Sequence, residues 1–283
     1  MLKQRVITAI LLLAILLPAL LHPNVWPFNL LVLVLVTTGG WEWGRLNGLQ
    51  PLGAVATAVV AALLCVATWQ MGWLAQPHPA LWLLAGAAWV LGSACLVKAG
   101  VPGWAKIPFI VRWCAGVLAL WVAGLAMVQA RQMGVNFLLS ILVLVWVADV
   151  FAYFAGRALG LRFTKVKLAP AISPGKSWEG AWGGALGVVA LAFVWVALDR
   201  ANQVQVLSFY SRVFDRGWWL LLLAALFMAA MSVVGDLVES LIKRSAGVKD
   251  SSQLLPGHGG VLDRIDALLP TLPLAMMLTS LVQ

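Results

Sequence analysis

Three aspartates in the last fifth of the sequence have the arrangement of a metal site. Asp236 follows a long apolar run, and Asp263 and Asp266 stand three residues apart at the start of the next one, so both later carboxylates would point to one side of a helix. With no Cys and only one isolated His nearby, they suit a hard cation such as Mg²⁺ better than zinc. We predict all three as metal ligands. The alternative is salt bridging of Asp263 and Asp266 to basic neighbours, namely Lys243, Arg244 and Arg264.

A polar stripe and a glycine-containing loop accompany these aspartates. Asp236, Glu239, Ser240 and Lys243 are spaced i, i+3, i+4 and i+7, which places them on one face of an otherwise apolar helix. The loop that follows contains glycines and His258, for which packing within the loop is an equally good explanation. Lysines and glycine backbone N–H groups suit an anionic polyphosphate. Acids for a metal beside bases for phosphates indicate phosphoryl or nucleotidyl transfer.

A second group of polar residues ends an apolar run near the middle of the chain. Asp149, Tyr153 and Arg157 are four residues apart and share one helix face. An acid this deep in a membrane-type segment is costly, which makes Asp149 a candidate functional residue. The alternative is a structural contact of Asp149 with Tyr153 or Arg157.

The segment that follows, 165–180, contains the tripeptide Gly-Lys-Ser at 175–177. A nucleotide P-loop is excluded, because Pro170 stands where its first glycine is required and no strand precedes it. We expect Ser173 to cap the next helix and Lys176 and Ser177 to lie in its first turn. Helix N-terminal N–H groups beside a lysine could then hold a phosphate. The alternative is an ordinary capped helix with a lysine at the membrane surface.

The elements that position these residues are membrane helices. The sequence is 63% hydrophobic and 10% charged, and its mean hydropathy is +0.96, which excludes both an ordinary soluble domain and a disordered chain. Its apolar runs are also too long for the strands of a β-barrel. We predict an all-α polytopic protein with about nine spans. They are 6–21, 28–43, 54–73, 79–97, 109–128, 137–154, 181–198, 218–235 and 265–282.

The basic residues predict how these spans are oriented. With the N-terminus inside, the cytoplasmic loops hold 15 Lys and Arg and the outer loops hold 4, the asymmetry typical of membrane proteins. The net charge of +9 therefore indicates topology and does not imply a nucleic-acid partner. We divide the chain into N-terminal transmembrane helices (1–135) and a C-terminal catalytic region (136–283). Its polar loops, 155–180 and 243–264, both fall on the cytoplasmic side.

Three stretches of the C-terminal half resemble the phosphatidate cytidylyltransferase (CDP-diacylglycerol synthase) family. The longest is 240–266, which contains Ser-Leu-Ile-Lys-Arg, then Lys-Asp-Ser-Ser, then Leu-Pro-Gly-His-Gly-Gly-Val-Leu-Asp-Arg-Ile-Asp. The others are Ser-Pro-x-Lys-Ser-Trp-Glu-Gly at 173–180 and Asp-x-x-Ala-Tyr-x-x-Gly-Arg at 149–157. The N-terminal half is similar only in its hydrophobic spans.

This resemblance implies an enzyme of phospholipid biosynthesis that makes CDP-diacylglycerol and pyrophosphate from CTP and phosphatidic acid. It implies Mg²⁺, with K⁺ as an additional ion, and a bacterial inner membrane with the active site facing the cytoplasm. A homodimer is a further expectation. By similarity, Asp236, Asp263 and Asp266 would hold the metal. The nucleotide-binding and phosphate-binding candidates are Ser173, Lys176, Ser177, Asp149, Tyr153, Lys167, Lys243, Arg244, Lys249 and His258.

Two departures from the family pattern and two rival functions stay open. Val150 and Phe151 replace an expected Thr-Gly or Ser-Gly, and Gly175 replaces a commoner Lys. One rival is a CTP-dependent transferase that acts on another lipid phosphate, such as a polyprenyl phosphate. The other is a cation-coupled transporter, which would place acids near mid-bilayer on several spans. Here the acids are instead expected to cluster at one cytoplasmic edge, beside loops of the phosphate-binding type.

Overall fold

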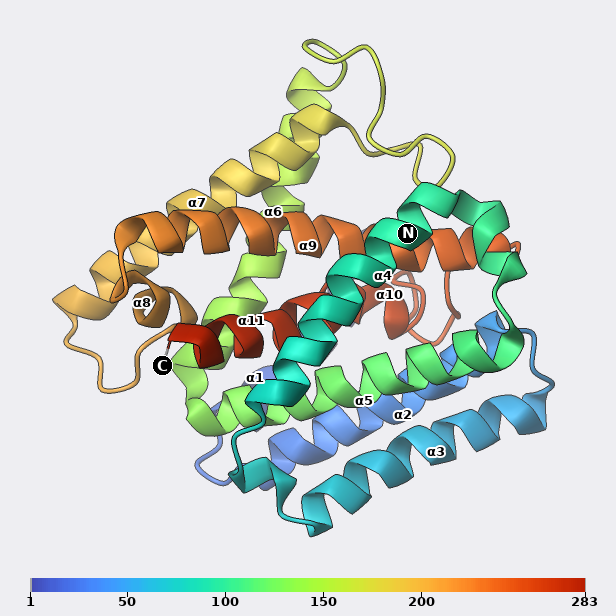
Figure 1. Cartoon of the computed structure of the whole chain (residues 1–283), viewed down its shortest axis with the longest axis horizontal. Coiled ribbons are helices and arrows are strands. Elements are labelled where there is room, and N and C mark those ends of the chain that lie inside the picture. The colour runs from blue at the N-terminus through green and yellow to red at the C-terminus, as the bar shows by residue number, and fades with distance from the viewer. Residues whose placement is uncertain (1, 283) are drawn as a thin grey trace.

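The computed structural model describes residues 2–282, which form helices joined by loops and contain no β-strand (Figure 1). A chain this apolar must satisfy its backbone within helices if it is to cross a membrane. The α-helices in chain order are α1 (Leu2–Leu21), α2 (Trp26–Leu46), α3 (Pro51–Gln70), α4 (Pro79–Lys106), α5 (Phe109–Met133), α6 (Val135–Leu159), α7 (Trp178–Ala201), α8 (Phe209–Phe214), α9 (Trp218–Ser245), α10 (Leu262–Ile265) and α11 (Leu268–Val282).

The predicted fold class is confirmed. Each predicted span falls largely within one long helix, with α10 and α11 together covering the last. Among the described residues, seven helices are long and apolar enough to cross a membrane, namely α3, α4, α5, α6, α7, α9 and the α10–α11 segment. The apolar part of α1 is shorter, and α2 is not among the seven. The number of spans and the side on which the chain begins therefore stay predictions.

Helices α6 and α7 form an antiparallel pair whose connecting loop projects at the top of Figure 1. Glycines on α7 allow the two backbones to approach closely. A Cβ added to Gly184 would lie 2.7 Å from the carbonyl oxygen of Ala148, and one added to Gly180 would lie 2.9 Å from that of Ala152. Small residues at such crossings are typical of packed membrane helices. This pair carries the polar segment 149–180.

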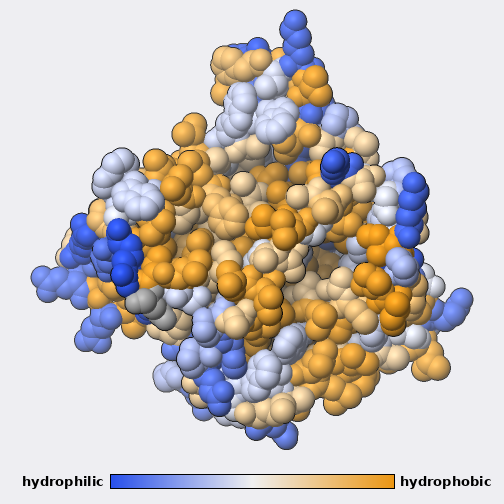
Figure 2. Space-filling view, in the orientation of Figure 1, coloured by the Kyte–Doolittle hydropathy of each residue, from blue (hydrophilic) through white to orange (hydrophobic). Residues whose placement is uncertain are grey.

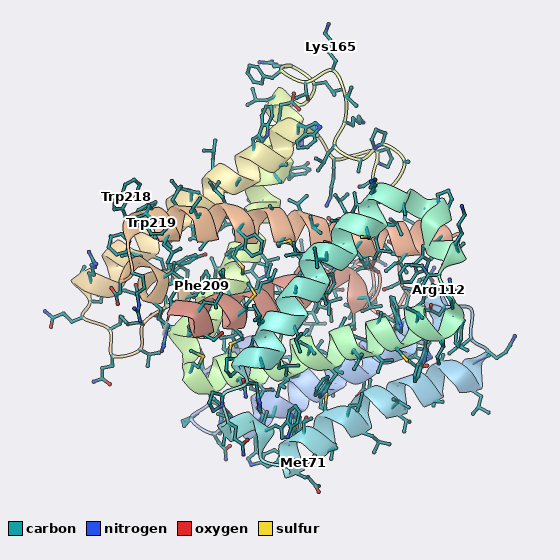
Figure 3. All side chains as sticks on the ribbon, in the orientation of Figure 1. Met71, Arg112, Lys165, Phe209, Trp218 and Trp219 are labelled. Atoms are coloured by element: carbon teal, nitrogen blue, oxygen red, sulfur yellow. The ribbon has the colours of Figure 1, made fainter. Side chains whose placement is uncertain are left out.

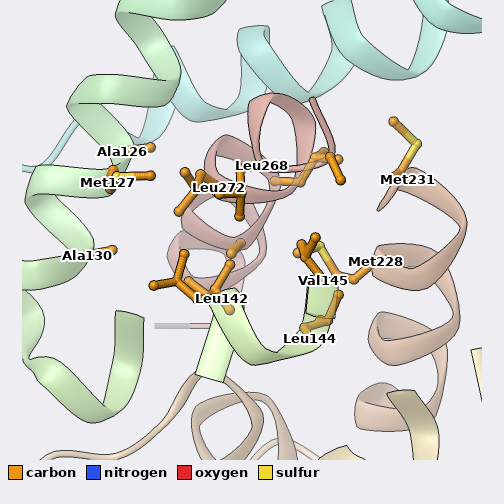
Figure 4. Packing of buried hydrophobic residues seen from close by; sticks show 14 of the residues in the cluster. Ala126, Met127, Ala130, Leu142, Leu144, Val145, Met228, Met231, Leu268 and Leu272 are labelled. Atoms are coloured by element: carbon orange, nitrogen blue, oxygen red, sulfur yellow. The ribbon is translucent and has the colours of Figure 1, made fainter. Parts of the chain in front are cut away.

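The centre of the molecule is α11, which packs against α4, α5 and α9. Figure 4 shows apolar side chains of α5, α6, α9 and α11 converging there. The buried residues in this view include Met127, Leu142, Leu144, Val145, Met228, Leu268 and Leu272. Because lipid is as apolar as these side chains, close packing holds the helices together.

The outer surface is that of a protein surrounded by lipid. Figure 2 shows a broad hydrophobic area over the middle of the molecule, with hydrophilic residues mainly toward its edges. Trp218 and Trp219 are exposed at the start of α9, and Lys165 lies at the tip of the loop between α6 and α7 (Figure 3). Exposed tryptophans at a helix end are typical of the membrane interface. The chain is an integral membrane protein.

Candidate active site

A cluster of carboxylates forms where α9 meets the α10–α11 segment. Asp236 and Glu239 lie on one face of α9, and Asp266 lies between α10 and α11. One ligand oxygen from each of the three lies within 4.8 Å of the other two. Three carboxylates at this spacing fit a hard divalent cation such as Mg²⁺. We call Asp236, Glu239 and Asp266 the carboxylate cluster.

The structure brings two of the three predicted metal ligands together and places Asp263 next to them, joined to Glu239 through Lys243. Asp236 and Asp266 belong to the cluster, whereas Asp263 does not, and Glu239 completes the set. Sequence reasoning placed Glu239 on the polar stripe but did not include it among the ligands. The signal was available, because Glu239 is one helical turn from Asp236 and so must share its face.

Asp263 is occupied by hydrogen bonds within the protein. Its Oδ1 accepts from Lys243 Nζ at 2.5 Å, and its Oδ2 accepts from the backbone N–H groups of Ser251 at 2.9 Å and Gly260 at 2.7 Å. The hydroxyl of Ser251 is also 2.8 Å from Oδ2. The alternative of a salt bridge between Asp263 and Lys243 is therefore confirmed. Asp263 organises the loop 250–262 beside the cluster.

Two lysines place positive charge against these acids. Lys243 is buried and pairs with both Glu239 and Asp263, so it joins α9 to the start of α10. Lys176, in the segment just before α7, pairs with Asp236 at 2.6 Å. A buried charge such as that of Lys243 requires partners, because its desolvation is costly, whereas Lys176 and Asp236 are half-buried. Each lysine thus links a cluster residue to a polar segment predicted from the sequence.

A cavity of about 480 Å³ lies beside the cluster, between α6, α7, α9 and the loop that joins α6 to α7. Four predicted nucleotide-binding residues line it together with Asp236, namely Asp149, Tyr153, Lys176 and Ser177. Arg157 lines it as well and donates a hydrogen bond to the Tyr153 hydroxyl at 3.1 Å. Residues 149–157 and 176–177, which are separate in the sequence, therefore form one wall of the site.

The predicted helix cap at Ser173 is wrong. Helix α7 begins at Trp178, and its N-cap is Ser177, whose Oγ accepts from Gly180 N–H at 3.2 Å. Residues 169–176 instead close on themselves as a turn, since Ser173 N–H donates to Ala169 O at 2.8 Å. Lys176 consequently precedes the helix and does not lie in its first turn. Both Ser173 and Ser177 are of a residue type that caps helices. Ser173 belongs to the turn, so Ser177 is the cap.

The other predicted site residues lie outside the cavity wall. Lys167 donates to the carbonyl oxygen of Pro174 within the same loop as Ser173. Arg244 is exposed and donates to Val248 O at 3.1 Å. Lys249 is exposed and His258 is half-buried, both in the loop 246–261. The structure therefore does not bring Ser173, Lys167, Arg244, Lys249 and His258 into contact with the carboxylate cluster.

Sequence reasoning also missed two buried glutamates that shape the polar loops. Glu179, in the first turn of α7, accepts from the backbone N–H groups of Phe163 at 3.1 Å and Thr164 at 2.7 Å. It thereby anchors the loop between α6 and α7. Glu42, near the end of α2, accepts hydrogen bonds from the loop 250–262. The signal for Glu42 was an acid within a predicted span, which is unfavourable without a partner.

Gly235 allows the close crossing that brings Asp236 and Asp266 together. A Cβ at this position would lie 2.6 Å from Asp266 O and 2.8 Å from Pro270 Cγ. We therefore expect Gly235→Ala to separate α9 from α11 and to lower the free energy of unfolding by about 1–3 kcal/mol. Gly92→Ala is the control, because nothing lies within 4 Å of its added Cβ. Thermal unfolding of both purified variants tests this, and equal midpoints for the two would contradict it.

Apolar membrane helices that enclose acids, lysines and a polar cavity are typical of a membrane-embedded enzyme of the phosphoryl- or nucleotidyl-transfer class. The chain belongs to the cytidylyltransferase family, whose profile matches residues 3–282. It is 40% identical over 281 residues to a phosphatidate cytidylyltransferase of Pseudomonas aeruginosa, covering 96% of this chain and 95% of that protein. It is 37% identical over 293 residues to one of Haemophilus influenzae, covering 96% of each. A Thermotoga maritima protein of the same name is 41% identical over 154 residues, which are 54% of this chain and 52% of that protein.

Proposed function

We propose that this protein is a phosphatidate cytidylyltransferase, which condenses CTP with phosphatidic acid to give CDP-diacylglycerol and pyrophosphate. The observation that carries the proposal is the convergence of the carboxylate cluster, Lys176 and Lys243 beside one cavity. It occurs in a chain that matches relatives of this name over nearly its whole length. The substrates are thus a nucleotide and a lipid, and the enzyme works in the membrane.

The reaction is a displacement at the α-phosphorus of CTP. An oxygen of the lipid phosphate forms the new P–O bond, and the bond between the α-phosphorus and its bridging oxygen to the β-phosphate breaks, releasing pyrophosphate. The lipid phosphate is already ionised at neutral pH, so no general base is needed. The main obstacle is repulsion between two anions, which fixed positive charges and positioning reduce.

The residues of this chain divide that task between them. Asp236, Glu239 and Asp266 would hold Mg²⁺, which when bound supplies positive charge to the phosphates. Lys176 stands where it can exchange its partner Asp236 for a phosphate of CTP. Ser177 and Tyr153 line the same wall of the cavity. Lys243 keeps Asp263 and Glu239 in place. A potassium ion near these residues stays a prediction.

The position of the site also suits substrates from two phases. The cavity lies beside the lipid-facing helices α6 and α7, so a lipid headgroup and a water-soluble nucleotide could both enter. The uneven distribution of basic residues supports a cytoplasmic-facing site, which we place in a bacterial inner membrane. A homodimer stays a prediction.

The test is synthesis by the purified protein reconstituted in vesicles. We expect labelled CTP, phosphatidic acid and Mg²⁺ to give CDP-diacylglycerol and pyrophosphate in equal amounts. We expect EDTA to reduce the rate at least about 100-fold, and added Mg²⁺ to restore it, because the metal supplies several kcal/mol of charge stabilisation. A polyprenyl phosphate in place of phosphatidic acid is the control. Product from that lipid alone would favour the related transferase, and a folded protein that forms neither product would contradict the proposal.

A further inference from the structure

Glu42 is a fully buried acid on α2 that accepts four hydrogen bonds from the loop 250–262. Its Oε1 accepts from the Ser252 hydroxyl at 2.5 Å and from Val261 N–H at 2.9 Å. Its Oε2 accepts from Leu262 N–H at 2.7 Å and from the Ser251 hydroxyl at 3.1 Å. The donors lie 209 to 220 residues later in the chain. A side chain of the N-terminal half thus holds a loop of the C-terminal half.

These contacts satisfy backbone N–H groups at the N-terminal end of the last membrane segment, which is formed by α10 and α11. The first N–H groups of a helix have no partner within the helix and must be satisfied from outside it. Here Glu42 accepts those of the N-cap residue Val261 and of Leu262, and Asp263 accepts the N–H of Gly260 in the preceding loop. Helix α10 has no side-chain cap from its own N-cap residue. A carboxylate at this end also interacts favourably with the helix dipole.

A continuous series of contacts connects Glu42 with the carboxylate cluster. The Ser251 hydroxyl lies between Glu42 Oε2 and Asp263 Oδ2, at 3.1 Å and 2.8 Å. Asp263 in turn holds Lys243, which pairs with Glu239 of the cluster. The fit is tight, because a Cβ added at Gly260 would collide with both the Glu42 carboxylate and the Ser251 hydroxyl. A change at Glu42 must therefore alter the loop 250–262, whose residues Ser251 and Gly260 hold Asp263.

We propose that Glu42 is a positioning residue for cytidylyl transfer. It lies outside the carboxylate cluster and outside the cavity wall, and it acts by fixing the loop 250–262 and thereby Asp263 and Lys243. The kinetic part of this inference rests on the proposed function, whereas the structural part does not. An acid buried in a membrane helix is costly, and the four contacts offset that cost here.

The test compares Glu42→Gln with Asp199→Asn. Asp199 is the matched control, because it is a buried acid near the end of α7 that also accepts four hydrogen bonds, from Asn136, Ser208 and Ser211. Glutamine keeps the size of Glu42, but its amide group would face N–H donors. We expect amide hydrogen exchange in 250–262 to quicken about tenfold or more in Glu42→Gln only, and exchange in 202–211 to quicken in Asp199→Asn only.

The kinetic readout separates positioning from general destabilisation. We expect kcat to fall at least about 30-fold in Glu42→Gln, with the KM for CTP changed less than about threefold, and kcat to stay within about twofold of the wild type in Asp199→Asn. If Glu42→Gln does not fold, Ser252→Ala removes one donor only and should shift both readouts in the same direction by less.

Three results would overturn the inference: unchanged exchange in 250–262, unchanged kcat despite faster exchange there, or equal loss of kcat in both variants. If the wild type makes no CDP-diacylglycerol but Glu42→Gln still opens 250–262 selectively, the proposed function fails, while the structural role of Glu42 is supported.

Discussion

Asp266→Asn should reduce turnover by about three orders of magnitude while leaving the protein folded. Asp266 contributes a carboxylate to the cluster, and the neutral amide oxygen of asparagine is a weaker ligand for a hard cation. Loss of one preorganised electrostatic contact in a transferase site costs about 10²–10³ in rate, and loss of a metal costs more. The measurement is CDP-diacylglycerol formation from labelled CTP across a Mg²⁺ titration. We expect both a lower maximum and a higher Mg²⁺ requirement.

Asp263→Asn separates the two roles that an aspartate can have in this site. Asp263 holds Lys243 and the loop 250–262, and it does not belong to the cluster. Its variant should therefore lose turnover with the Mg²⁺ requirement unchanged. Asp215→Asn is the control, because Asp215 is exposed and its ion pair with Arg200 is long, at 4.0 Å. Equal shifts of the Mg²⁺ requirement in Asp263→Asn and Asp266→Asn would restore Asp263 as a metal ligand.

Lys243→Met should have the largest effect on stability. The ammonium group is buried between Glu239 and Asp263, and its removal leaves two buried carboxylates without a cation. Removing one partner of a buried ion pair costs about 3–5 kcal/mol. We expect the thermal unfolding midpoint in detergent to fall clearly and turnover to fall at least about 100-fold.

A double variant and a surface control test whether unpaired buried carboxylates cause the loss of stability in Lys243→Met. Lys243→Met combined with Asp263→Asn should recover part of the lost stability, because it removes one of the unpaired charges, but it should not recover turnover. Arg200→Met removes an exposed cation whose ion pair with Asp215 is worth about 1 kcal/mol or less. If Lys243→Met unfolds at the same temperature as Arg200→Met, the buried pairs do not stabilise the protein as we expect.

The sequence was sufficient to predict the helices, because a span needs only a long enough apolar run. The run at 109–128 lies within α5, and the run at 137–154 lies within α6. The predicted helix ends were less accurate where polar residues continue a helix. For example, α9 extends ten residues beyond the predicted end at residue 235, to Ser245. Hydropathy does not detect these final turns, although they carry Asp236, Glu239 and Lys243.

The site could be predicted in part. Spacing along a single helix was reliable, and the stripe from Asp236 to Lys243 does share one face. The grouping of Asp263 with Asp266 was not reliable, because Asp263 is held by Lys243, Ser251 and Gly260, whereas Asp266 belongs to the carboxylate cluster. The contacts of Lys176 with Asp236 and of Glu42 with Ser252 join distant segments, so only the folded chain reveals them.

The contact between Glu42 and Ser251 has a consequence for how the protein is made. A ribosome synthesises the N-terminal part first, so α2 exists while the 209 residues up to Ser251 are still being added. Throughout that interval the growing chain contains an acid in an apolar helix, and the final partners of this acid do not yet exist. Biogenesis must therefore keep α2 available until the loop 250–262 and α10 dock against it, and a nascent chain that stops before residue 262 cannot form these contacts.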